Sequence, residues 1–76
     1  MDWRDHIVLD PAVCHGKATF RGTRVLVSTV LAYLAAGRTE PEIREDFPAV
    51  TADGIRSALA YAADVVGAER VVAISS

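Results

Sequence analysis

The group Arg21-Gly22-Thr23-Arg24, with Lys17 just before it, is the densest set of chemically capable side chains in this sequence. Guanidinium and ammonium groups contact the phosphates of nucleic acids or the carboxylates of protein partners. Glycine accepts positive φ, so Gly22 predicts a tight turn that presents these cations. Lys17, Arg21 and Arg24 are therefore candidate DNA contacts. In the structural alternative, Arg24 braces the turn by donating hydrogen bonds to nearby carbonyls.

The sequence offers no pattern typical of an active site. The Gly16-Lys17 pair lacks the earlier glycine and the following serine or threonine of a phosphate-binding loop. The adjacent Cys14-His15 pair lacks the spacing of metal ligands, and Cys14 is the single cysteine. We expect a protein that is not an enzyme and that needs no metal and no cofactor.

Hydrophobic spacing indicates the elements that would position the basic turn. Three short apolar runs, at residues 7–9, 18–20 and 24–27, predict a small sheet of two or three strands, with the basic turn as a hairpin. Ser28 is the expected N-cap of a first helix, and Gly37 is expected just past its end. We expect an α+β domain that is mostly α, with a short N-terminal β-hairpin before three helices.

The last two helices are predicted to form a helix-turn-helix arrangement. Thr39 and Glu42 have the spacing of a capping box that starts the second helix. The third helix should open at Thr51, with its apolar stripe on Ile55, Leu59, Ala62 and Val66. The apolar tail beyond Gly67 could be a strand, a helix extension or a segment that orders on a partner.

A helix-turn-helix reader would contact DNA through the start of its third helix. Thr51, Arg56 and Ser57 are the candidate contacts there, and Arg56 is the strongest base reader because arginine pairs with guanine in a bidentate way. Asp53 would repel phosphate. The alternative is a plain helical hairpin that only packs a core.

Length, composition and charge indicate the number of domains, the oligomeric state and the cellular location that we expect. The 76 residues predict one domain, with a β-rich segment 1–27, a helical core 28–66 and a tail 67–76, and 51% of them are hydrophobic. That much apolar surface on so small a chain predicts a homodimer or a partner complex. The formal net charge is −2, with a basic excess in residues 1–38 and an acidic excess in residues 39–76. With no signal peptide and no apolar run that could cross a bilayer, we expect a cytoplasmic protein.

The sequence resembles the domain of unknown function 433 family, whose members are commonly described as VapB-like antitoxins. The resemblance covers roughly residues 7–62 and is carried by Gly16-Lys17, the Arg21–Val25 block, Phe47-Pro48, Val50-Thr51 and Ala58–Tyr61. It implies a helix-turn-helix-like fold, pairing with a PIN-like ribonuclease toxin and no catalysis.

An antitoxin of this kind would bind and neutralise its toxin and could repress its own operon by binding operator DNA. Either the hydrophobic tail from Gly67 onward or the helix surface would cover the toxin's acidic metal site. In the tail, the expected contacts are Arg70, paired with a catalytic carboxylate, and the apolar Val71, Val72 and Ile74. Two alternatives stay open at this point: a stand-alone DNA-binding regulator, and an interaction module with no nucleic-acid role.

Overall fold

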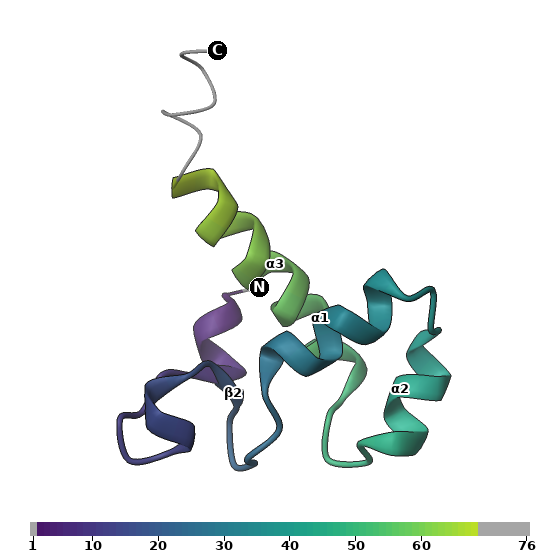
Figure 1. The fold of residues 1–76 in the computed structure, drawn as a ribbon, viewed down its shortest axis with the longest axis horizontal. Helices are drawn as coiled ribbons and strands as arrows, with labels where there is room; N and C mark the ends of the chain where they lie inside the picture. Colours follow the sequence, from purple (N-terminus) through teal and green to yellow (C-terminus); the bar gives the residue numbers. More distant parts are fainter. Residues whose placement is uncertain (1, 69–76) are drawn as a thin grey trace.

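A computed structural model describes residues 2–68 of the chain. The elements follow one another as a 3₁₀ turn η1 (Trp3–Asp5), strand β1 (Ile7–Val8), a second 3₁₀ turn η2 (Cys14–Gly16), strand β2 (Thr19–Phe20) and the helices α1 (Val27–Ala35), α2 (Glu40–Asp46) and α3 (Ala52–Ala68). Figure 1 shows the N-terminal segment beside α1 and α3, with α2 at the far end of the body. The predicted α+β class, mostly α, is confirmed.

The N-terminal sheet is smaller than the apolar runs predicted. β1 and β2 are antiparallel, with Ile7 opposite Phe20 and Val8 opposite Thr19. The chain does turn at Gly22, whose φ is +78°, and a single bridge joins Thr19 to Leu26. Residues 24–27 therefore add one bridge and not a third strand.

Helix α1 begins earlier than the expected N-cap Ser28. Leu26 occupies the N-cap position, and the Val27 N–H donates to the carbonyl of Ala18 at 3.0 Å. The last hydrogen bond of the hairpin thus leads directly into the helix, and Ser28 lies within its first turn. The prediction for the other end is confirmed, because Gly37 has a φ of +83° and its N–H closes a Schellman motif onto Leu34 at 3.0 Å.

The α2–α3 unit follows its predicted capping closely. The Thr39 side chain accepts from the Glu42 N–H while the Glu42 carboxylate accepts from the Thr39 N–H, which completes the capping box. The Thr51 hydroxyl accepts from the Gly54 N–H at 3.0 Å, so it caps α3. The helical core is slightly longer than the predicted range 28–66, since α3 continues through Gly67 to Ala68; an isolated glycine costs a helix only about 1 kcal/mol.

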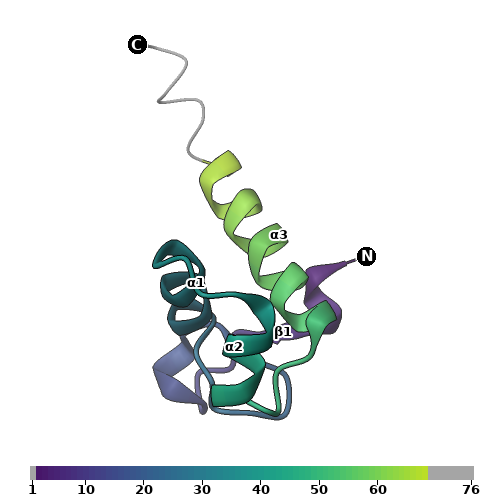
Figure 2. The same ribbon diagram turned by 90° about the vertical axis from the view of Figure 1, so that its right-hand side faces the viewer.

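The core draws apolar side chains from almost every element. Its buried members are Ile7, Phe20, Val27, Val30, Ile43, Val50, Ile55 and Ala58. Figure 2 shows α3 rising out of the body that α1, α2 and the N-terminal segment form. Along residues 2–68 no helix combines the length and the apolar character that a membrane span requires.

Candidate functional site

The predicted basic cluster divides into one structural arginine and two exposed cations. The Arg21 guanidinium donates to the Arg4 carbonyl through Nη2 at 2.8 Å and to the Asp5 carbonyl through Nε at 3.2 Å. These carbonyls end η1, so Arg21 holds that turn against the hairpin. The sequence raised this bracing role as the structural alternative for Arg24, and the structure gives it to Arg21.

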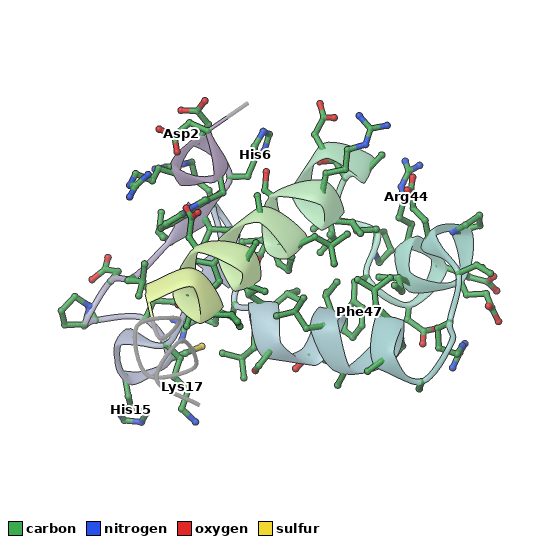
Figure 3. The ribbon with its side chains drawn as sticks, turned by 90° about the horizontal axis from the view of Figure 1, so that it is seen from above. Asp2, His6, His15, Lys17, Arg44 and Phe47 are labelled. Atoms are coloured by element: carbon green, nitrogen blue, oxygen red, sulfur yellow. The ribbon has the colours of Figure 1, made fainter. Side chains whose placement is uncertain are left out.

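The charged groups of Lys17 and Arg24 are not engaged by other side chains of the described residues. Both side chains are exposed, and within residues 2–68 neither forms a hydrogen bond or an ion pair. Figure 3 shows Lys17 extending away from the ribbon, beside His15, while Arg44 lies at the other end of the molecule. Lys17 and Arg44 therefore do not belong to one positive face.

The start of α3 offers fewer polar groups than the sequence predicted. Ser57 was expected to face outward, but its side chain is 0% exposed. It lies on the core side of α3 next to buried Ala58, so it cannot reach a DNA base. Arg56 is exposed but pairs with Asp53 at 3.5 Å, and the Thr51 hydroxyl serves as the α3 cap. DNA contact through Thr51 and Arg56 stays a prediction.

The most distinctive surface of the described chain is apolar. Leu59, Ala62, Ala63 and Val66 stand at positions i, i+3, i+4 and i+7 of α3, so they share one face, which we call the outer face of α3. Leu59 is 50% exposed and Val66 is 64% exposed. The apolar stripe that the sequence indicated is thus divided, because Ile55 is buried whereas Leu59 and Val66 are not.

The division of this stripe has a geometric cause. The first turns of α3 pack against the body, while its C-terminal half projects beyond it (Figures 1 and 2). Neighbouring Val65 is also 45% exposed. The large apolar side chains of this half of α3 are thus only partly covered by the rest of residues 2–68.

An aromatic contact holds the projecting helix to the N-terminus. The Trp3 indole N–H donates to Asp64 Oδ2 at 2.6 Å, and the Trp3 and Tyr61 rings meet edge to face with centroids 4.8 Å apart. The two rings pack on each other within one chain, and the role of Asp64 had no sequence signal.

The titratable groups with displaced pKa values have structural partners. Hydrogen bonds from Thr39 lower the pKa of Glu42, and the Arg4 backbone N–H lowers that of Asp2. The hydrogen bond that Tyr33 donates to Asp46 at 3.0 Å raises the Tyr33 pKa. Among the described residues, no group of three or more His, Cys, Asp and Glu side chains could hold a metal ion.

The family model for a protein of unknown function, DUF433, matches residues 7–62. The chain belongs to the DUF433 family. The matched segment contains β1, β2, α1, α2 and the packed half of α3. Trp3 and Asp64 lie just outside its two ends, as do Val65 and Val66.

A solved structure supports the same assignment. The chain is similar to a DUF433 member protein from Anabaena variabilis ATCC 29413, known from a crystal structure at 2.00 Å, with 29% sequence identity and a TM-score of 0.73. The similarity covers 96% of this chain and 71% of that chain. No curated protein matches at a significant level.

The predicted toxin contacts in the tail lie outside the described residues. These are Arg70, Val71, Val72 and Ile74. The sequence left the helix surface open as an alternative to the tail, without singling out the exposed members of the outer face of α3. The hydrophobic excess of the composition indicated that some apolar surface stays uncovered, but helical spacing alone could not say which part of the stripe it would be.

Proposed function

We propose that this DUF433 chain is a non-catalytic antitoxin that binds and neutralises a PIN-like ribonuclease toxin. One observation carries the proposal: the outer face of α3 leaves Leu59 50% and Val66 64% exposed on a projecting helix. Contiguous apolar surface of this kind marks protein contacts on small domains. An amphipathic helix laid in a groove of a partner is a common recognition mode.

The toxin would contact the outer face of α3 and then the chain that follows it. Apolar Val71, Val72 and Ile74 extend the series that Leu59 and Val66 begin. In this proposal Arg70 pairs with a carboxylate of the toxin's acidic metal site, and the pair blocks entry of RNA. The antitoxin acts in the cytoplasm as a homodimer.

Repression of its own operon is a secondary part of the proposal. The exposed cations Lys17 and Arg24 favour some contact with phosphate. A stand-alone DNA-binding regulator has weaker support, since Ser57 is buried and Asp53 pairs with Arg56 at the start of α3. Operator binding would then depend on few charges and fall modestly with added salt.

The test is co-purification with the product of the adjacent reading frame, followed by a ribonuclease assay with and without this chain. A stable complex with suppressed nuclease activity supports the antitoxin function. A neighbour that neither binds nor cleaves RNA contradicts it.

A double variant and a control variant test whether the toxin binds the outer face of α3. Leu59→Ser combined with Val66→Ser should weaken the complex by tenfold or more, because apolar side chains at an interface centre supply most of its binding energy. Both side chains are exposed, so the fold should tolerate the change. Glu45→Ser, an equally exposed change on α2, is the matched control and should leave binding unchanged. Equal binding by both variants would remove the outer face of α3 from the proposal.

A further inference from the structure

A second apolar surface lies on the described chain, separate from the outer face of α3. It is a groove of about 450 Å³ between the loop after β1, the first turns of α1 and the middle of α3. Its apolar lining is formed by Leu9, Val27, Leu31 and Tyr61. Val27 is buried, Leu31 and Tyr61 are half-buried, and Leu9 is 52% exposed at the edge. We call it the Leu9–Leu31 groove.

Among the described residues, the charge that borders this groove is positive. Lys17 borders it, and no aspartate or glutamate does. Three other hollows on the described surface are of mixed charge, since each combines an aspartate, Asp5 in one and Asp10 in two, with at least one arginine. In a chain of net charge −2, a groove with a cation and no carboxylate is complementary to a negative ligand.

The Lys17 ammonium group has not been neutralised by the protein. Within residues 2–68 it forms no ion pair, and it extends away from the ribbon (Figure 3). Ser28, in the first turn of α1, also borders the groove and is exposed. The groove therefore combines an apolar floor with one hydroxyl group and one cation.

We propose that the Leu9–Leu31 groove binds a short peptide segment of a protein partner, with two adjacent aliphatic side chains on the floor and a neighbouring carboxylate at Lys17. Its volume lies in the lower part of the ~300–1,000 Å³ range of ligand sites. Because Leu9 leaves the groove open at its edge, a peptide can cross it, and a peptide with its carboxylate at Lys17 also has backbone amides to pair with the Ser28 hydroxyl, which an acyl chain lacks. The proposal does not involve the outer face of α3, so it stands independently of the antitoxin function.

The experiment is an NMR titration of the ¹⁵N-labelled full chain with the synthetic peptide acetyl-Glu-Leu-Leu-amide. Two matched peptides accompany it: acetyl-Lys-Leu-Leu-amide reverses the charge, and acetyl-Glu-Ser-Ser-amide removes the aliphatic side chains. Octanoate is a fourth probe, which carries a carboxylate on an acyl chain without a peptide. We expect saturable shifts at Leu9, Leu31 and Tyr61 with the first peptide and much weaker binding of the other three probes.

Variants at exposed positions then test whether the Lys17 ammonium group contacts the carboxylate of the peptide. Lys17→Glu should weaken binding of the acidic peptide about two- to fivefold and strengthen binding of the basic peptide, as expected for an exposed ion pair. Leu9→Ser should weaken binding of both the acidic and the basic peptide. Arg24→Glu is the matched control, since Arg24 is an exposed cation that does not border this groove.

Four results would overturn the proposal. They are absence of saturable shifts at the groove, equal binding of the acidic and basic peptides, loss of binding in Arg24→Glu as large as in Lys17→Glu, or tighter binding of octanoate than of the peptide. The last would identify an acyl-chain site in place of a peptide site. None of these results bears on toxin neutralisation, so the two proposals fail separately.

Discussion

The indole N–H of Trp3 donates to Asp64 Oδ2 at 2.6 Å, across 61 positions of sequence. The Trp3 ring also meets the edge of Tyr61, with an interplanar angle of 80°. These contacts join the first described turn of the chain to α3 at the point where the helix leaves the body. The N-terminal turn thus holds the base of the projecting half of α3, which carries the proposed toxin contact.

Replacing Trp3 should lower stability in two steps. Trp3→Phe keeps an aromatic ring against Tyr61 but loses the hydrogen bond to Asp64, which should cost about 0.5–1.5 kcal/mol. Trp3→Ala also removes the ring contact and should cost about a further 0.5–1.5 kcal/mol. Urea unfolding, followed by far-UV circular dichroism, measures both free energies of unfolding.

A double-mutant cycle checks that the hydrogen bond is the cause. Trp3→Phe combined with Asp64→Ala should lose little more stability than the larger single loss, because each change already breaks the same bond. Strictly additive losses would mean that Trp3 and Asp64 stabilise the protein independently, contrary to the structure.

Arg21 and Arg24 should behave differently although both belong to one turn. Arg21→Lys leaves a single ammonium where a guanidinium donated to two carbonyls, so we expect a loss of about 1 kcal/mol. Arg24→Lys should change stability by less than about 0.5 kcal/mol, since the side chain is exposed. Thermal unfolding of the two variants, measured side by side, compares their losses of stability. Equal melting temperatures would argue against the bracing role of Arg21.

Local signals in the sequence predicted most of the helical boundaries. Thr39, Glu42 and Gly37 act through neighbours one turn away, so their spacing was sufficient to locate the start of α2 and the end of α1. Ser28 failed as a predictor because a hydrogen bond from the hairpin, Val27 N–H to Ala18, starts α1 earlier. That bond belongs to the tertiary structure and leaves no trace in local spacing.

The candidate surfaces were harder to predict because they, too, depend on tertiary structure. Ile55, Leu59 and Val66 follow one helical period, and only the way α3 packs against the body separates the buried member from the exposed ones. Ser57 looked outward by residue type, yet a small hydroxyl fits a tightly packed helix contact as well as alanine does. Arg21 and Arg24 are chemically identical, and only the position of η1 distinguishes their roles.

Gly54 is a site where alanine should increase stability. A Cβ there would lie 3.4 Å from Thr51 Oγ1 and 3.5 Å from Val50 Cγ1 and Phe20 Cδ1, which is the near end of ordinary van der Waals contact. Alanine favours the helix over glycine by about 0.5–1 kcal/mol, so Gly54→Ala should stabilise by about that amount. Chemical denaturation should show a higher midpoint with an unchanged slope.

Gly37→Ala is the matched control for Gly54→Ala. Gly37 has open space around it but a φ of +83°, and this left-handed conformation costs an L-residue about 1–2 kcal/mol. We expect opposite signs for the two variants. Destabilisation by both would mean that the Gly54 site is packed too tightly for a methyl group.

Acid should weaken the capping box of α2 through Glu42. The Glu42 carboxylate accepts from the Thr39 N–H at 2.9 Å, and these Thr39 hydrogen bonds hold its pKa below the ordinary glutamate value. A pKa that is lower in the folded state means that the unfolded state binds the proton more readily. The stabilisation is therefore complete above the unfolded-state pKa and is lost as the pH falls through the lower, folded-state pKa.

Glu42→Gln isolates this contribution, because glutamine can still accept from Thr39 but does not titrate. Asp2 and the other carboxylates titrate in both proteins, so their effects cancel in the comparison. Urea midpoints measured from about pH 7 down to about pH 3 should fall more steeply for the natural sequence than for Glu42→Gln, and the two curves should converge at the acidic end. Parallel curves over the whole range would show that ionisation of Glu42 makes no difference to folding, and that the capping box acts through its geometry alone.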